Sequence, residues 1–150
     1  MANTYIKVYV HYVFSTKNRE PFINPAVEKR LWAYMASLAR EIEVEPLAIN
    51  GTEDHIHFLA SLPATVTLAD VMKKVKAVSS LWLSRTFEEL ADFEWQAGYG
   101  AFSIYHYDLK KTIRYIKNQK EHHKNESFED EIRGLLIKNN LKFDEKNLFK

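Results

Sequence analysis

The chain has 150 residues, 46% of them hydrophobic, which is enough for a single domain, 1–150, with a sizeable core. It contains no cysteine, which excludes disulfides and thiolate metal sites and makes a reducing cytoplasm the expected location. No signal peptide and no apolar run of about 18 residues is present, so no contact with a membrane is expected. The formal net charge is only +1, so binding to nucleic acid would have to depend on local charge.

Patterns typical of strands and of helices alternate along the chain. Asn24 followed by Pro25 predicts a helix start, because asparagine caps a helix and proline suits its first position. Asn50-Gly51 between two apolar runs predicts a hairpin turn. The expected elements are a strand at 5–14, a helix from 25 to about 41–43, strands at about 44–50 and 55–60, a helix from 68 through 82 capped by Thr67, a strand at 101–106, a helix at 109–122 capped by Asp108, and a helix from Ser127 to about 139.

The first six elements follow the order βαββαβ, which predicts an α+β, ferredoxin-like fold. Four antiparallel strands would carry two helices on one face, and the C-terminal helices would be additional. In the usual strand order of this fold the first and third strands are central. The strand at 55–60 is therefore expected in the middle of the sheet.

His55 and His57 lie two positions apart on this central strand, so both rings point to one face and can reach one divalent cation. Asp54 precedes the pair and can orient one ring by accepting a hydrogen bond. Burying two polar rings within an apolar strand costs free energy unless each ring has a bonding partner. The alternative is structural: one histidine caps a loop and the other makes a hydrogen bond in the core.

The expected helix at 109–122 places Tyr115 and Gln119 one turn apart along one edge, beside its buried stripe. The stretch 108–124 contains six Lys or Arg residues, and an acidic cluster follows it. A tyrosine, an amide oxygen and several cations therefore share this edge. The alternative is that Tyr115 is a packing residue and the lysines are merely solvated. The acidic cluster consists of Glu126, Glu129, Asp130 and Glu131.

These residues occur in an order that resembles a known family. His55-Ile56-His57 resembles the motif of the HUH endonucleases, and the stretch from Tyr115 to Gln119 resembles the tyrosine motif of the small single-tyrosine insertion-sequence transposases. The likeness runs from about residue 5 to the end, without a departure in the core motifs. Further segments that fit are Thr16 to Arg19, Asp54, Trp95 to Ser103, and His122-His123.

The resemblance implies a homodimeric transposase that nicks and rejoins single-stranded DNA at hairpin-bearing element ends. Tyr115 would be the nucleophile and would form a 5′-phosphotyrosine, so no nucleotide cofactor is expected. His55, His57 and Gln119 would hold Mg²⁺ or Mn²⁺. Whether the tyrosine helix comes from the same subunit as the histidines stays open. The expected phosphate contacts are Lys17, Arg19, Lys111, Arg114 and Lys117, with Trp95 and Tyr99 as candidates for base stacking. The alternative for Trp95 is a core or hinge anchor.

Two other functions remain compatible with these residues. The first is a nucleic-acid-binding protein, or a nuclease used by the host, that has kept the fold and no longer transposes. The second is a small metal-dependent hydrolase that uses the histidine pair with Asp54, with Tyr115 purely structural. The hydrolase would cleave its substrate without forming a covalent adduct with DNA.

Overall fold

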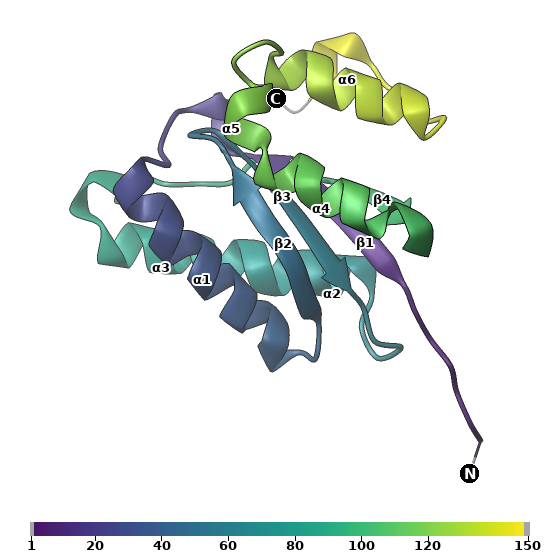
Figure 1. The fold of residues 1–150 in the computed structure, drawn as a ribbon. Coiled ribbons are helices and arrows are strands. Elements are labelled where there is room, and N and C mark those ends of the chain that lie inside the picture. Colours follow the sequence, from purple (N-terminus) through teal and green to yellow (C-terminus); the bar gives the residue numbers. More distant parts are fainter. Residues whose placement is uncertain (1, 149–150) are drawn as a thin grey trace.

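The structure is a computed structural model that describes residues 2–148. A four-stranded sheet with the order β2-β3-β1-β4 forms its centre (Figure 1). The expected α+β fold with an antiparallel sheet is confirmed, and β1 and β3 are central as predicted. The strands are β1 (Tyr9–Ser15), β2 (Glu45–Gly51), β3 (His55–Ser61) and β4 (Gly100–Ile104).

Two helical segments cover one face of the sheet, as the βαββαβ order predicts. The first is α1 (Pro25–Glu41), and the second is a run of α2 (Leu68–Met72), a π-helical turn (Lys73–Ala77) and α3 (Val78–Thr86). Their apolar side chains form the main core with alternate residues of the central strands. These strand residues include Tyr12, Phe14, Ile56 and Phe58.

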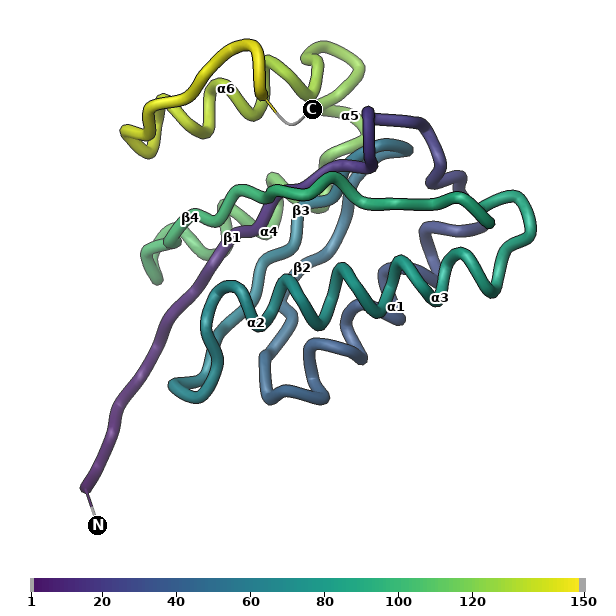
Figure 2. The backbone as a smooth tube through the Cα atoms, turned by 180° about the vertical axis from the view of Figure 1, so that it is seen from behind, coloured from purple at the N-terminus to yellow at the C-terminus, as the bar shows by residue number. Residues whose placement is uncertain are grey.

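Three further helices lie on the opposite face, so the sheet is enclosed between two helical layers (Figure 2). Ile116 packs with Ala48 and Leu59 of the sheet, whereas Phe128 and Ile132 pack with Val13 and Phe102. Because both faces are covered, every residue of β1 is buried. The three helices are α4 (Leu109–Lys117), α5 (Gln119–His122) and α6 (Phe128–Lys138).

Some expected boundaries were wrong. The first strand begins at Tyr9, not at residue 5, because only from there does it pair with β3 and β4. The fourth strand ends at Ile104 and is followed by a 3-10 turn, His106–Asp108. The expected helix at 109–122 is broken at Asn118, whose φ of −96° and ψ of 18° are not those of a helix. The segment after residue 139, for which no element was expected, contains a 3-10 turn, Glu145–Asn147.

Most of the expected helix caps are present. The side chains of Asn24, Thr67 and Ser127 accept hydrogen bonds from the first turns of their helices. Asp108 precedes α4 but makes no such bond with its side chain. Among the described residues, no helix is both long and apolar enough to cross a membrane.

Candidate functional site

The histidine pair points to the side of the sheet that α4, α5 and α6 cover, where it meets Gln119 and Glu131. The rings of His55 and His57 are 1% and 0% exposed. A Cβ atom on Gly51 would lie 2.0 Å from the carbonyl oxygen of His55. Glycine is therefore required at this point of β2, and its close approach fixes the backbone at the start of β3.

The His55 ring is held from several sides. Its Nδ1 lies 2.9 Å from Oδ1 of Asp54, which also accepts a hydrogen bond from Thr52. Burial acts to raise the pKa of Asp54, but the hydrogen bond and charge of His55, together with the hydrogen bond from Thr52 and the charge of Arg19, lower it on balance. With Nδ1 donating to this carboxylate, a neutral ring presents a lone pair at Nε2. That atom lies 3.1 Å from the amide oxygen of Gln119, so two acceptors face each other.

His57 links the sheet to α6. Its Nδ1 lies 2.8 Å from Nε2 of His11, on the neighbouring strand, and its Nε2 lies 2.9 Å from Oε1 of Glu131. Burial, together with repulsion from His57, lowers the pKa of His11 to about 3. Burial also lowers the pKa of His57. Both rings are therefore neutral near pH 7, which is the form in which an imidazole nitrogen binds a metal.

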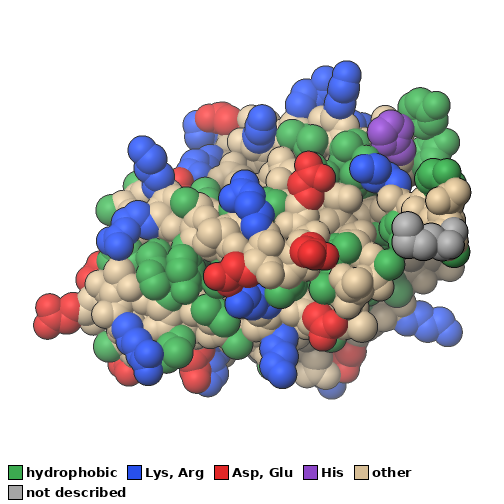
Figure 3. Space-filling model, turned by 90° about the horizontal axis from the view of Figure 1, so that it is seen from below, with side chains coloured by type: hydrophobic (Ala, Val, Ile, Leu, Met, Phe, Trp, Pro, Cys, Tyr) green, Lys and Arg blue, Asp and Glu red, His purple; other side chains and the backbone are tan. Residues whose placement is uncertain are grey.

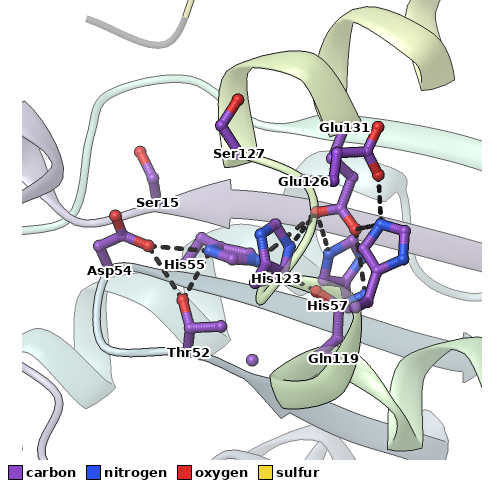
Figure 4. Close-up of polar contacts among 12 residues, drawn as sticks. Ser15, Thr52, Asp54, His55, His57, Gln119, His123, Glu126, Ser127 and Glu131 are labelled. Carbon is purple, nitrogen blue, oxygen red and sulfur yellow. Dashed lines mark hydrogen bonds and ion pairs between the residues drawn. The ribbon is translucent and has the colours of Figure 1, made fainter.

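Glu131 of α6 is the carboxylate at the centre of the site (Figure 4). It accepts hydrogen bonds from Nε2 of His123 at 3.0 Å and from Nε2 of Gln119 at 3.1 Å, in addition to the bond from His57. Burial acts to raise the pKa of Glu131, but the hydrogen bonds from His123 and His57 outweigh it and hold the pKa far below its usual range. The carboxylate is therefore an anion surrounded by donors.

Tyr115, half-buried on α4, donates its hydroxyl hydrogen bond to Oε2 of this same carboxylate. Burial raises the pKa of Tyr115, and the negative charge of Glu131 raises it further. The Tyr115 ring also meets the His57 ring edge-on, at 5.6 Å between centroids. One carboxylate thus joins the tyrosine hydroxyl to the histidine pair within a single chain.

The break between α4 and α5 brings Gln119 into the site. The side chain of Asn50 on β2 donates to the carbonyl oxygens of Ile116 and Lys117, at 3.0 and 3.1 Å. These two bonds hold the last turn of α4 against the sheet. The chain then turns at Asn118, and Gln119 at the start of α5 is 0% exposed.

The donor set of the cluster fits a divalent metal ion. Ligand atoms of His55, His57, His123 and Glu131 all lie within 4.8 Å of one another. Three imidazoles and one carboxylate are typical ligands of Zn²⁺ and Mn²⁺, whereas Mg²⁺ prefers oxygen. A cation would also satisfy the two acceptors that face each other at Nε2 of His55 and the oxygen of Gln119.

The five basic residues expected to contact phosphate fall into three places. Lys111, Arg114 and Lys117 line an open hollow of about 630 Å³ that Tyr115 also lines. Arg19 lines a cavity of about 680 Å³ that opens onto His55 and His123. Lys17 pairs with Glu94 at 2.5 Å in a different hollow, which Trp95 also lines.

The surface seen from below is mixed in charge (Figure 3). On the face turned by 90° from Figure 1, Lys and Arg side chains are interspersed with Asp and Glu (Figure 3). Trp95, a candidate for base stacking, is only 8% exposed. It donates from Nε1 to Ser79 and packs edge-on with Phe14 and Phe93, so it is a core residue and that expectation was wrong.

Three residues of the cluster were not assigned to it from the sequence. Glu131 was grouped with a run of acidic residues, and no role was predicted for His11. His123 entered only as part of the family resemblance. A signal for Glu131 does exist, because it lies between Phe128 and Ile132 on the buried stripe of α6. A charged residue on an apolar stripe requires a partner.

Comparison with known proteins agrees with the fold and with the order of the motifs. The family model described as "Transposase IS200 like" matches residues 4–119. His123 and Glu131 lie beyond the end of this match. No curated protein matches the sequence.

Two solved structures share the fold. One is of a proposed transposase from Deinococcus radiodurans, with a TM-score of 0.63 and 20% identity over 79% of this chain and 96% of that one. The other is of a REP-associated tyrosine transposase bound to a REP hairpin, with a TM-score of 0.61 and 17% identity over 82% of this chain and 73% of that one. The family match covers most of the chain, and the motifs within it lie together in the structure. The chain therefore belongs to the IS200-like transposase family.

Proposed function

We propose that this protein nicks and rejoins single-stranded DNA through a covalent 5′-phosphotyrosine on Tyr115. The observation that carries the proposal is the carboxylate of Glu131, which accepts hydrogen bonds from both the Tyr115 hydroxyl and Nε2 of His57. The proposed nucleophile therefore lies beside a cluster of side chains that could hold a metal ion. DNA with a hairpin is the proposed substrate, in line with the REP hairpin bound by the structural neighbour.

The residues support a balanced cleavage step. The Tyr115 oxygen forms a bond to the phosphorus of the scissile phosphate and releases its proton to water, because Glu131, whose pKa lies far below its usual range, is too weak a base to take it. The bond from phosphorus to the 3′ oxygen of the preceding nucleotide breaks. That oxygen takes a proton from water and leaves as a 3′-OH. Lys111 and Arg114, which line the hollow beside Tyr115, are placed to contact the phosphates on either side.

Rejoining reverses the same chemistry. A 3′-OH attacks the phosphotyrosine and releases its proton to water, the bond between phosphorus and the Tyr115 oxygen breaks, and the phenol takes a proton from water. Because the covalent link conserves the energy of the phosphodiester, the cycle needs no nucleotide cofactor. The four glycines of the chain form no Gly-rich phosphate loop, in keeping with this scheme.

The ligands we propose for a divalent cation are His55, His57, His123 and Glu131, with Gln119 contributing its amide oxygen. When bound, the cation would supply positive charge to the oxygens of the scissile phosphate. The imidazole-rich donor set favours Mn²⁺ over Mg²⁺. Asp54 and His11 lie behind His55 and His57 and hold the two rings in orientation.

The competing hydrolase would use Asp54 together with the histidine pair. Asp54 contacts Nδ1 of His55, away from Nε2 and the rest of the cluster, and it also accepts the hydroxyl of Thr52. This position suits an orienting role better than that of a metal ligand. The other alternative, a nuclease that serves the host and no longer transposes, would use the same residues.

The test uses a labelled single-stranded hairpin oligonucleotide, taken from the DNA that flanks the coding sequence, with Mn²⁺ or Mg²⁺. A band of covalent protein–DNA adduct on a denaturing gel, absent in Tyr115→Phe, is the expected result. Tyr34→Phe is the matched control, because Tyr34 stacks on Trp82 on the other side of the sheet and should leave the adduct unchanged. Cleavage without an adduct, insensitive to Tyr115→Phe, would establish the hydrolase instead.

A further inference from the structure

A second hollow adjoins Tyr115 and has no part in the chemistry described so far. It is a cavity of about 240 Å³ between the sheet, α4 and α6. Tyr115 lines both this cavity and the open basic hollow, so the two spaces meet at the proposed nucleophile. Pockets that bury drug-sized ligands have roughly 300–1,000 Å³, so this one suits a single planar ring system.

One wall of the cavity is aromatic. The buried ring of His11 lies between the rings of Phe102 and Tyr115, meeting them edge-on at centroid distances of 6.3 and 6.4 Å. Tyr105 lines the cavity as well and is 66% exposed. A flat apolar ligand that enters there contacts several rings at once, and unpaired nucleobases bind to proteins in this way.

Apart from Ile104 and Leu135, the remaining lining is polar and partly cationic. Lys111 from α4 and Lys138 from α6 contribute ammonium groups, and Asp108 contributes a carboxylate whose side chain makes no helix-cap hydrogen bond. The hydroxyl of Thr112 is bound to the carbonyl oxygen of Asp108 at 2.9 Å. A base offers N–H donors that suit a carboxylate and carbonyl oxygens that suit an ammonium group.

Resting on the proposed nicking function, we infer that this cavity binds one unpaired nucleobase of the nucleotide next to the scissile phosphate. The phosphate would lie at the Tyr115 hydroxyl, and the backbone would continue over the basic hollow that Lys111 and Arg114 line. The base would turn into the cavity against His11 and Phe102. The cavity would thus set which base is accepted beside the cleavage point.

The experiment measures base binding without any strand cleavage. ¹⁵N-labelled protein is titrated with each of the four deoxynucleoside 5′-monophosphates and, as the base-free probe, with 2-deoxyribose 5-phosphate. We expect amide shifts in β4, from Phe102 to Ile104, and at Thr112, with the nucleotides and not with the sugar phosphate. Equal shifts and equal affinity with the sugar phosphate would identify a phosphate site and overturn the inference.

Two exposed tyrosines provide a matched pair of variants. Tyr105 lines the cavity, whereas Tyr107, which is 81% exposed and 5.3 Å away between ring centroids, does not. Tyr105→Ala should weaken nucleotide binding at least about fivefold, the smallest effect expected from losing one aromatic stack, and Tyr107→Ala should not. Thr112→Leu, which fills the cavity from α4, should weaken binding as well.

Three further results would overturn the inference. One is an equal effect of Tyr105→Ala and Tyr107→Ala, and another is the absence of shifts with any nucleotide. The third is a set of shifts at the same amides that depends on protein concentration alone, which would mark a contact between two copies of the chain. None of these results bears on the covalent adduct, so the cavity and the nicking function can fail separately.

Discussion

At the scale of single residues, the site depends on the carboxylate of Glu131, which was not assigned to it from the sequence. Glu131 belongs to a run of acidic residues with Glu129 and Asp130. Such a run is typical of a solvent-exposed first turn of a helix. In the structure it is only 3% exposed, and it accepts hydrogen bonds from two helices and from β3. His55 and His57 could be predicted because strand alternation fixes their direction. For Glu131 the apolar stripe of α6 indicates burial, but its partners could not be predicted, because they depend on where α6 packs.

Replacing Glu131 tests its part in metal binding. Glu131→Gln keeps the shape of the side chain and removes the negative charge, so Mn²⁺ affinity should fall at least about tenfold. Glu121→Gln is the matched control, because Glu121 is exposed and pairs only with a lysine, Lys124, at 2.9 Å. Isothermal titration with Mn²⁺ measures both variants. Equal affinities for wild type and Glu131→Gln would remove Glu131 from the ligand set.

His11 should make the protein sensitive to acid. Its pKa is about 3 in the folded chain, against an ordinary value of 6.5, so between these values the unfolded chain binds more protons than the folded one. The stability that His11 contributes is therefore complete above about pH 6.5 and is lost as the pH falls towards 3. We expect urea unfolding to show a smaller loss of stability from pH 7 to pH 4.5 in His11→Asn. An equal loss in both proteins would contradict this account.

At the scale of elements, periodicity predicted the order of strands and helices but not the break in the tyrosine helix. The stretch 109–122 has no proline or glycine, so nothing local marks the break. A tertiary contact lies at the break, where Asn50 donates hydrogen bonds to the carbonyl oxygens of Ile116 and Lys117. The expected relative position of Tyr115 and Gln119 was that of two residues in one continuous helix. In the structure they lie on two helices, α4 and α5, and both reach the cluster.

The docking of α6 can be tested with two isoleucines of the same helix. Ile132 is 1% exposed and packs with Val13, Phe102 and Phe128, whereas Ile137 is 66% exposed. Ile132→Ala should lower the free energy of unfolding by about 2–5 kcal/mol. It should also weaken Mn²⁺ binding, because α6 carries Glu131.

Ile137→Ala should change the free energy of unfolding by no more than about 0.5 kcal/mol and leave Mn²⁺ binding intact. Urea unfolding and calorimetric titration measure the two effects on both proteins. If Ile132→Ala lost stability but bound Mn²⁺ as wild type does, α6 would have no part in the metal site.

At the scale of the whole molecule, the fold was predictable because the βαββαβ order leaves few arrangements of the strands. The meeting of the histidine pair with Tyr115 was not, since 58 positions separate His57 from Tyr115 and the family resemblance allows the tyrosine to come from either subunit. In the structure, one chain supplies His57, Glu131 and Tyr115 to the same network. We therefore propose that a single chain assembles the complete site, whether or not it forms a homodimer.

Mixing two inactive variants tests this proposal. Tyr115→Phe keeps the histidines, and His57→Ala keeps the tyrosine. If each site comes from one chain, the mixture should form no more adduct than the two variants do separately. If subunits exchanged their tyrosine helices, mixed dimers would contain one intact site, and adduct formation would return. A denaturing gel with the labelled hairpin oligonucleotide measures the outcome.

The position of Glu131 on α6 also has a consequence during protein synthesis. A growing chain leaves the ribosome from its N-terminus, so the sheet, the histidine pair and Tyr115 emerge before α6 does, and early segments begin to fold while later ones are still being made. Until α6 emerges, no carboxylate connects Tyr115 to His57. A partly synthesised chain therefore lacks the carboxylate of the proposed metal site until α6 has been made.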